Sequence, residues 1–410
     1  MRQPIIFYMY TGDDLVIANV RNREIRKIRK ILLALFILFT AAVYSVCSGY
    51  TAFAQAESSI VIEKESGRVL YQYDPRKQMA VASTTKIMTA IVAIEYGDPD
   101  DIVTVSANAA NTEGSSMYLE SGEEIGLNNL LYGLMLSSGN DAAVAISEHI
   151  TEKTGLDFVG LMNEKARSLG AESTHFDNPN GLPSDTHYST AYDMAVITKY
   201  ALDNPKFKEI VSTKSVSLPG QNGDYGRALT NHNKLLSMCE GCIGVKTGYT
   251  KSAGRCLVSA VERGGMTLIC VTLNDPDDWN DHMYLYDQLF SEYGFKKIIS
   301  KTDKLAEIKV ENGTSEYIKL VSDKEYSLPL NENDKYAIET DVNPEYALPV
   351  SAGDVLGSGR IILNGEEYGR FNLIAENSVD EIPADTFSEQ LKDNMSGILS
   401  FFMQLFTGRR

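Results

Sequence analysis

The spacing of apolar residues changes near residue 297 of this 410-residue chain, and that change constrains the fold more than any other feature. Between residues 57 and 296, segments with helical spacing alternate with strand-like runs. From residue 297 to 378 the pattern is one of short alternating strands separated by glycine-containing turns. The helical segments are 83–95, 127–136 and 141–151. We therefore expect an α/β (α+β) domain over 57–296 and a small all-β domain over 297–380.

The first 56 residues have the composition of an export signal. A positive cluster at residues 26–30 precedes an almost uninterrupted apolar run over 31–46, and small residues before Glu57 offer a cleavage site. An uncleaved anchor helix is the alternative, although the run is short for a full membrane span. We expect 1–56 to be a signal peptide with a long leading region and the mature protein to be exported.

The last segment, 383–410, has apolar residues at helical spacing with charged and polar residues between them. The apolar positions are Phe387, Leu391, Met395, Ile398, Phe402 and Leu405. This pattern predicts an amphipathic helix that lies in the outer surface of the cytoplasmic membrane. The alternative is a helix packed on its own β domain. Its position after Pro383, at the end of an exported chain, favours the membrane.

The charge of the chain argues against one class of partner. Its 55 Asp and Glu outnumber its 38 Lys and Arg, which gives a formal net charge of −17. Nucleic-acid binding depends on neutralising phosphates with basic side chains, so we expect no nucleic-acid partner.

The spacing of two cysteines suggests a metal or redox site, but the further ligands that a zinc site needs are not present in the sequence. Cys239 and Cys242 form a Cys-x-x-Cys pair, but a zinc site needs a second such pair or paired histidines. We therefore expect no metal, while a disulfide between these two cysteines stays an alternative. Cys256 and Cys270 fall in strand-like runs and are expected to be buried.

A serine and a lysine three residues apart are the first candidates for chemistry. Ser83 and Lys86 begin and end a Ser-Thr-Thr-Lys run, and on a helix this spacing places both side chains on one face. Lys86 would take the Ser83 proton if burial and nearby positive charge lowered its pKa. Alone, this pair is a weak signal.

Two further short motifs follow in the chain. Ser138, Gly139 and Asn140 lie in a turn between two apolar helices, where a hydroxyl and an amide project into a cleft. Lys246, Thr247 and Gly248 precede a predicted strand and offer a positive charge, a hydroxyl and a glycine that permits close backbone approach to a ligand.

The three motifs in this order are the signature of penicillin-binding proteins and class A β-lactamases. The chain most resembles the low-molecular-mass penicillin-binding proteins that act as serine D-alanyl-D-alanine carboxypeptidases. Residues 174–182, 187–194 and 246–253 (KTGYTKSA) extend that resemblance. It implies a DD-peptidase/β-lactamase-like domain with a central antiparallel sheet flanked by helices.

The resemblance also implies roles for individual residues. Ser83 would be the nucleophile, Lys86 its general base, and Ser138 a proton relay. The substrate-binding residues would be Asn140 at the substrate amide, Lys246 and Thr247 at the terminal carboxylate, and Gly248 and Tyr249 beside them, with the backbone N–H groups of Ser83 and Tyr249 forming the oxyanion hole. His232 stands where some relatives have arginine, so the cation that completes the carboxylate site is open and a plain loop histidine is an equal alternative.

The implied substrate is the peptidoglycan pentapeptide, with β-lactams as covalent inhibitors and no cofactor. One alternative is a serine β-lactamase; class A enzymes use an additional glutamate, and no Glu-x-x-Leu-Asn pattern occurs between Ser138 and Lys246. Another is a noncatalytic penicillin-sensing or wall-binding protein, which the intact pair of Ser83 and Lys86 disfavours.

Overall fold

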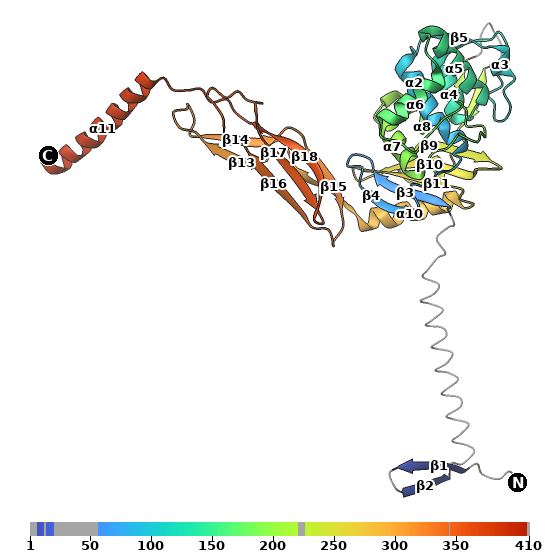
Figure 1. Ribbon diagram of the computed structural model, residues 1–410, viewed down its shortest axis with the longest axis horizontal. Coiled ribbons are helices and arrows are strands. Elements are labelled where there is room, and N and C mark those ends of the chain that lie inside the picture. The colour runs from blue at the N-terminus through green and yellow to red at the C-terminus, as the bar shows by residue number, and fades with distance from the viewer. Residues whose placement is uncertain (1–5, 12–13, 20–55, 220–225, 344, 408–410) are drawn as a thin grey trace. The chain divides into compact units, whose positions relative to one another are not determined.

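The computed structural model describes residues 6–11, 14–19, 56–219, 226–343 and 345–407 (Figure 1). The chain forms two units, 1–55 and 56–410. In the first unit, β1 (Ile6–Thr11) pairs antiparallel with β2 (Asp14–Asn19). The apolar run expected to be the core of the signal peptide lies outside the described residues.

A five-stranded antiparallel sheet with the order β4-β3-β11-β10-β9 forms the centre of the second unit. Its strands are β3 (Ser58–Glu63), β4 (Val69–Tyr73), β9 (Cys242–Thr250), β10 (Gly254–Arg263) and β11 (Met266–Leu273). The sequence predicts two hairpins, one over 58–73 and one over 255–273. Both are formed, and β3 pairs with β11 across about two hundred residues of chain. This sheet confirms the expected α/β (α+β) class and its antiparallel centre.

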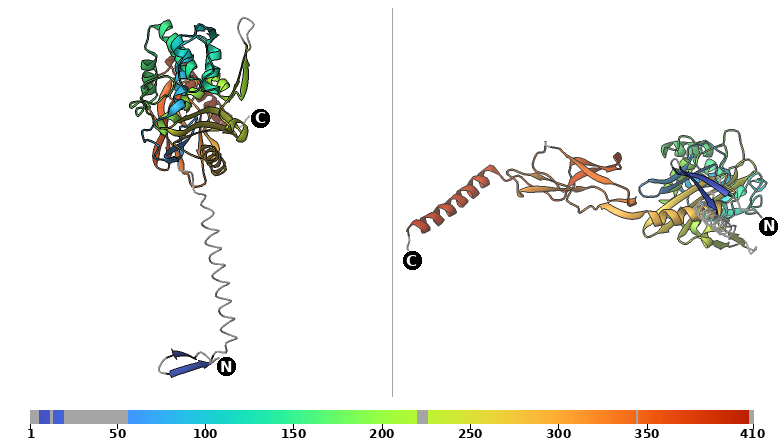
Figure 2. Two further views of the ribbon diagram at one scale, coloured as in Figure 1. Left: turned by 90° about the vertical axis from the view of Figure 1, so that its right-hand side faces the viewer. Right: turned by 90° about the horizontal axis from the view of Figure 1, so that it is seen from below.

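Helices cover both faces of this sheet (Figures 1 and 2). They are the 3₁₀ turn η1 (Ala82–Thr85), α2 (Lys86–Tyr96), α3 (Ala107–Ala110), α4 (Leu127–Leu136), α5 (Asn140–Thr154), α6 (Phe158–Ser168), α7 (Ala191–Leu202), α8 (Pro205–Ser212), α9 (Leu235–Met238) and α10 (Asp278–Glu292). Helix α7 packs against β3 and β11, and α10 packs against β10 and β11 from the other face. Two small hairpins, β5 (Ile102–Thr104) with β6 (Glu124–Gly126) and β7 (Ser215–Leu218) with β8 (Arg227–Thr230), complete this part.

Thr190 and Asp193 have the spacing of a capping box at the start of helix α7, and the structure forms half of it. The Thr190 hydroxyl accepts the backbone N–H of Asp193, as an N-cap should. The Asp193 carboxylate does not form the reciprocal hydrogen bond with the Thr190 backbone. It accepts hydrogen bonds from the backbone N–H of Ser173 and the hydroxyl of Thr174 instead. The helix start thereby holds the chain segment that leads into the loop at residues 177–189.

A second, all-β part follows the central sheet. Five strands pair in the order β13-β14-β18-β17-β16, and β12 pairs with β15. Their bounds are β12 (Gly294–Ile299), β13 (Ala306–Lys309), β14 (Tyr317–Ser322), β15 (Tyr326–Leu330), β16 (Tyr336–Val342), β17 (Val355–Leu363) and β18 (Glu366–Ala375). Its hydrophobic core, around Ile318, Leu320 and Leu373, is separate from the core of the first part.

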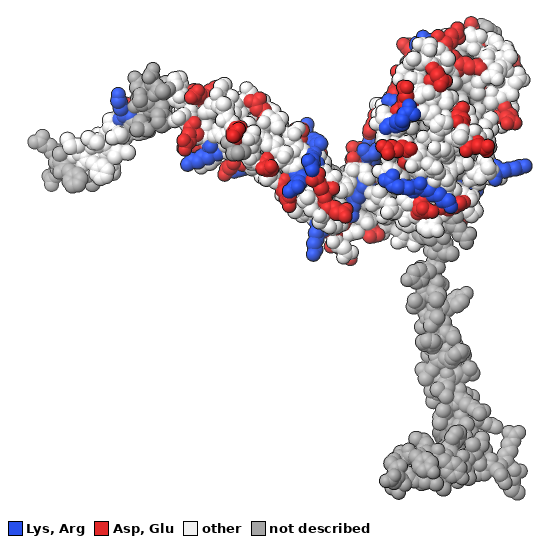
Figure 3. Space-filling model, viewed as in Figure 1, with Lys and Arg blue, Asp and Glu red and all other residues white. Residues whose placement is uncertain are grey.

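The chain ends in one long helix, α11 (Ala384–Thr407). In its described part, Met395, Ile398 and Phe402 of the expected apolar stripe are more than half exposed. Their neighbours Leu399, Phe401 and Met403 are exposed as well, which gives this stretch a largely uncharged surface (Figure 3). Among the described residues, no helix has both the length and the apolar character needed to cross a membrane.

Candidate active site

Ser83 and Lys86 lie together at the start of the first long helix. The sequence predicts a helix from Ser83 onward, but the structure places Ser83 in η1, and the α-helix begins only at Lys86. In a 3₁₀ turn the side chains at positions i and i+3 eclipse each other. Lys86 Nζ is consequently 3.0 Å from Ser83 Oγ.

The Lys86 amine is fully buried and has two other close neighbours. Its Nζ lies 2.6 Å from the Asn140 Oδ1 and 2.6 Å from the backbone oxygen of Asn180. Burial, together with the positive charge of Lys246, holds the pKa of Lys86 well below its usual value. A neutral amine has two N–H donors and one lone pair. The two carbonyl oxygens accept both donors, so the lone pair is left for the Ser83 hydroxyl.

The second motif forms the wall beside this pair. Ser138 follows α4 with a positive φ of 57° and is almost fully buried, and Asn140 is the first residue of α5. The Asn140 amide is used at both ends, since its Oδ1 accepts from Lys86 and its Nδ2 donates to the Glu113 carbonyl. Asn140 therefore orients Lys86 here, and its contact with a substrate amide stays a prediction.

The third motif runs along β9 beside η1. Gly248 is needed for this close approach, because a Cβ atom there would lie 3.1 Å from both the Ser83 nitrogen and the Val81 oxygen. Lys246 is fully buried and donates to the Thr247 carbonyl at 2.9 Å. Burial lowers the pKa of Lys246 to about 7, so its charge is only partial near neutral pH.

One pocket of about 280 Å³ collects most of the predicted residues. It is lined by Ser83, Ser115, Ser138, His232, Thr247, Gly248, Tyr249, Arg255, Asp278 and Trp279. Lys86 and Asn140 lie behind Ser83, and Lys246 precedes Thr247 on the same strand. A larger hollow of about 570 Å³ lies on β16, β17 and β18, but its lining has no paired nucleophile and base. The smaller pocket is therefore the candidate active site.

His232 reaches this pocket without bringing a charge to it at neutral pH. Its backbone N–H donates to the Leu136 carbonyl, and its ring lines the pocket wall. Burial, and then the nearby Lys246 charge, lower the pKa of His232 below its usual value. The histidine is thus suited to hydrogen bonding and unsuited to being the cation of a carboxylate site.

The turn-forming residues at 178–183 predict a surface loop, but this loop is partly an interior one. Pro179, Asn180 and Gly181 are buried. The reason is that the backbone oxygens of Pro179 and Asn180 accept hydrogen bonds from the side chains of Thr89 and Lys86 on α2. The expectation was wrong because turn-forming residues indicate a loop but do not say which side of it faces the core.

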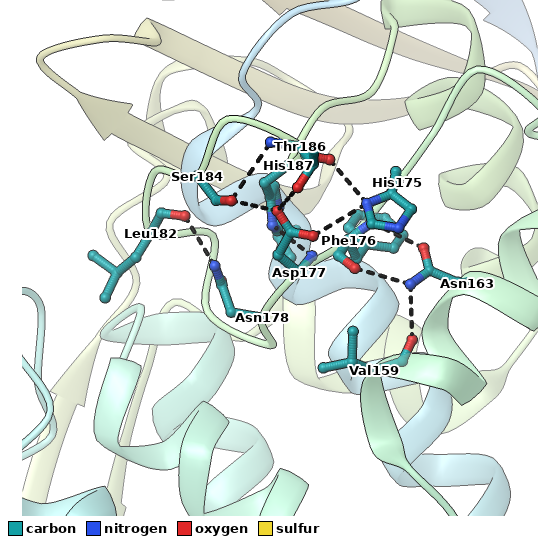
Figure 4. A network of polar contacts seen from close by, with 11 residues as sticks. Val159, Asn163, His175, Phe176, Asp177, Asn178, Leu182, Ser184, Thr186 and His187 are labelled. Carbon is teal, nitrogen blue, oxygen red and sulfur yellow. Dashed lines mark hydrogen bonds and ion pairs between the residues drawn. The ribbon is translucent and has the colours of Figure 1, made fainter.

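A polar network holds this loop in place (Figure 4). The Asp177 carboxylate accepts from the hydroxyls of Ser184 and Thr186. His187 Nδ1 accepts the Asp177 backbone N–H at 3.1 Å, so the ring proton is on Nε2, which donates to the Thr85 hydroxyl at 2.8 Å. Burial lowers the pKa of His187 to about 4 and keeps it neutral. The loop that supplies the Asn180 oxygen is thereby tied directly to η1.

Comparison with known proteins places this chain in a family. Residues 48–277 match the family described as D-alanyl-D-alanine carboxypeptidase, and residues 293–381 match the C-terminal domain of penicillin-binding protein 5. The chain belongs to this family of serine-type carboxypeptidases. The expected resemblance is confirmed.

Individual relatives are similar to this chain over most of its length. D-alanyl-D-alanine carboxypeptidase DacF of Bacillus subtilis is 33% identical over 81% of this chain and 88% of its own length. DacD of Escherichia coli is 28% identical over 80% of this chain and 87% of its own. The crystal structure of penicillin-binding protein 5 from Haemophilus influenzae, 26% identical, covers 80% of this chain and 98% of its own with a TM-score of 0.68.

The cysteines that the structure describes do not line the pocket of this carboxypeptidase. The described part of the chain has no group of three or more His, Cys, Asp or Glu side chains placed to hold a metal ion. Cys239 and Cys242 are unbonded, and Cys256 and Cys270 are buried in β10 and β11 as expected. Of the residues lining the pocket, only Asp278 carries a carboxylate, and its Oδ1 accepts a hydrogen bond from Arg255.

Proposed function

We propose that this carboxypeptidase removes the terminal D-alanine from peptidoglycan pentapeptides through an acyl-enzyme on Ser83. The observation that carries the proposal is the buried Lys86 amine beside the Ser83 hydroxyl, with both of its N–H donors already engaged. Such an amine is a base ready to accept a proton, and a hydroxyl is a nucleophile only when a base is positioned beside it.

The reaction proceeds in two halves. Ser83 Oγ bonds to the carbonyl carbon between the last two D-alanines while its proton moves to Lys86 Nζ. The C–N bond then breaks, and the leaving amine takes up a proton by way of the Ser138 hydroxyl. Water hydrolyses the resulting ester with Lys86 again as base. In each half the developing oxyanion is bound by the backbone N–H groups of Ser83 and Tyr249, and loss of one such donor typically costs about 2.7–4 kcal/mol.

The proposal is tested by D-alanine release from a synthetic pentapeptide. We expect release by the mature chain and its loss in Ser83→Ala, with unchanged release in Ser212→Ala, which removes a hydroxyl on α8 outside the pocket. Mass spectrometry of the peptide product should show the loss of one alanine. Release by Ser83→Ala at the wild-type rate would contradict the assignment of the nucleophile.

The cellular location is proposed from the two ends of the chain. Residues 1–56 would direct export, residues 57–296 would form the catalytic domain, and the β domain over 297–380 would act as a spacer above the membrane. Helix α11 would lie in the outer surface of the cytoplasmic membrane, which is consistent with its exposed Ile398, Phe401 and Phe402.

This location has its own test. The mature chain should sediment with phosphatidylglycerol-containing vesicles, and deletion of residues 383–410 should abolish sedimentation while D-alanine release persists. An Ile398→Asp variant should bind vesicles more weakly than an Asp393→Asn variant, which leaves the apolar residues intact. Unchanged sedimentation after the deletion would show that residues 383–410 do not bind the chain to the membrane.

A further inference from the structure

The proposed substrate ends in a carboxylate, and the pocket needs a cation to select it. The two cations expected from the sequence are poorly suited. Lys246 is fully buried with a pKa near 7, and its Nζ donates to the Thr247 backbone oxygen. His232 is neutral at the pH where the enzyme would work, because burial lowers its pKa.

The pairing of β9 with β10 brings a different cation to the pocket. Arg255 lies directly opposite Tyr249, and Leu257 lies opposite Thr247. Side chains on directly paired residues share a face, and those two apart on one strand share it too. Thr247, Tyr249 and Arg255 are therefore on the same face of the sheet, whereas Lys246 is on the other. Arg255, Thr247 and Tyr249 all line the pocket.

Two residues at the start of α10 hold the Arg255 side chain. One Nη donates to Oδ1 of Asp278, and the guanidinium carbon lies 5.6 Å from the centre of the Trp279 ring. The Asp278 side chain is only 3% exposed, whereas that of Arg255 is 39% exposed. The carboxylate thus lies behind the arginine, in the first turn of a helix, where negative charge is favourable.

The Nη groups of Arg255 still have free donors for a ligand. Among the described residues, the only side-chain hydrogen bond of Arg255 is the one from one Nη to Asp278, while its Nε is buried without a partner. A guanidinium keeps its charge throughout the physiological pH range and binds carboxylates with two parallel N–H groups. Asp278 and Trp279 fix its plane, so little side-chain freedom is lost when a carboxylate binds.

We propose that Arg255 is the residue that binds the C-terminal carboxylate of the substrate, with the Thr247 hydroxyl as its partner on β9 and with Asp278 and Trp279 as positioning residues. This assignment rests on the proposed carboxypeptidase function. It also explains why the enzyme would prefer substrates with a free C-terminal carboxylate. It replaces Lys246 and His232 as the carboxylate cation; Lys246 then acts on Lys86 by lowering its pKa.

The test compares two substrates that differ only at the chain end. One is a peptide ending in D-Ala-D-Ala with a free carboxylate, and the other is the same peptide as its C-terminal carboxamide. In Arg255→Gln we expect kcat/KM for the carboxylate to fall by about 10- to 100-fold, the usual effect of losing a charged hydrogen bond, and to change less than threefold for the carboxamide. Arg255→Lys should keep an intermediate preference.

Arg263 provides a matched control on the same strand. It also donates to an aspartate on α10, Asp287, and lies 5.0 Å from an aromatic ring, that of Phe290, but it is not among the pocket-lining residues. Arg263→Gln should leave the rates for both substrates within twofold of wild type. If Arg255→Gln unfolds because Asp278 is left unpaired, the double variant R255Q/D278N removes both charges and should show the same selective loss.

The outcomes separate this proposal from the one on which it rests. Equal losses on both substrates, or an unchanged rate on the carboxylate, would overturn the role of Arg255 while leaving the carboxypeptidase activity in place. Failure of the wild-type chain to release D-alanine from either substrate would overturn the proposed function and the role of Arg255 with it.

Discussion

The Nζ atom of Lys86 lies 3.0 Å from the Oγ atom of Ser83, in a position where its other neighbours are two carbonyl oxygens. In the described part of the chain no carboxylate forms an ion pair with it. A lysine placed in this way is more stable neutral than charged, because burial disfavours the ammonium form and the nearby Lys246 repels it. The same contacts that make Lys86 a base also aim it at the nucleophile.

Replacing Lys86 should therefore remove catalysis without removing the pocket. We expect Lys86→Gln to lower kcat/KM for D-alanine release by roughly 10²–10⁴-fold, the usual contribution of a general base. Lys77→Gln, which changes an exposed lysine paired with Glu57, is the control and should be close to wild type. Circular dichroism melting would show whether the variants stay folded. A folded Lys86→Gln with full activity would rule out Lys86 as the base.

The pH dependence of the reaction should report the charge of Lys246. Protonation of Lys86 abolishes its base function, so activity falls on the acid side of the Lys86 pKa. The Lys246 charge lowers that pKa, and Lys246→Gln should raise it. The acid limb of log kcat/KM should consequently move to higher pH in Lys246→Gln and stay in place in Lys251→Gln, an exposed neighbour. A shift of the limb to lower pH would show that Lys246 does not act on Lys86 in this way.

Buried histidines should make the protein less stable in mild acid. His187 has a folded pKa of about 4 and an unfolded value near 6.5, so the unfolded state binds the proton first. Stability is full above pH 6.5 and is lost as the pH falls to about 4, by up to about 1.4 kcal/mol per pH unit for one histidine. His282, with a pKa of about 3, adds to the same loss.

A single substitution isolates the His187 part of this loss. Urea unfolding of His187→Gln at pH 6.5 and pH 4.5 should show a smaller difference in unfolding free energy than the wild type shows. His149→Gln, on α5 outside the loop network, provides the comparison. An identical pH dependence in wild type and His187→Gln would show that this ring does not carry the effect.

Gly248 should be intolerant of even one methyl group. A Cβ atom there meets the backbone of Ser83 and Val81 at 3.1 Å, and backbone atoms in η1 have little room to yield. We expect Gly248→Ala to lower kcat by roughly tenfold or more, since small displacements of reacting groups are costly. Gly126→Ala, where no atom lies within 4 Å of the new Cβ, should keep its activity.

The sequence predicts the parts of the site that depend on side-chain identity at a fixed spacing. Ser83 and Lys86 are found from their separation together with the two motifs that follow them in order, and the two hairpins of the sheet from strand-like runs on either side of a turn. The contribution of Asn180 is not predictable in this way, because it is a backbone oxygen and every residue has one. Asn-Pro-Asn-Gly indicates a turn there, but only packing against α2 shows that the turn faces inward.

The place of Arg255 in the pocket is not predictable from the sequence for a different reason. Arg255 stands seven residues beyond Gly248, among residues that read simply as the start of a strand. Its place in the pocket depends on the register of β10 against β9 and on α10 returning Asp278 and Trp279 to the same face. Those pairings are long-range and leave no local pattern. The residue that we propose as the carboxylate-binding cation can therefore be identified only from the structure.

The roles of Ser83 and Lys86 are tested most directly by locating the bond that benzylpenicillin forms with the mature chain. Peptide mapping by mass spectrometry should find one equivalent of penicilloyl adduct on Ser83, slow to disappear, with no adduct in Ser83→Ala and greatly slowed formation in Lys86→Gln. An adduct on another residue, or one that forms on Ser83 at the same rate when Lys86 is replaced, would contradict the claim that Lys86 activates Ser83.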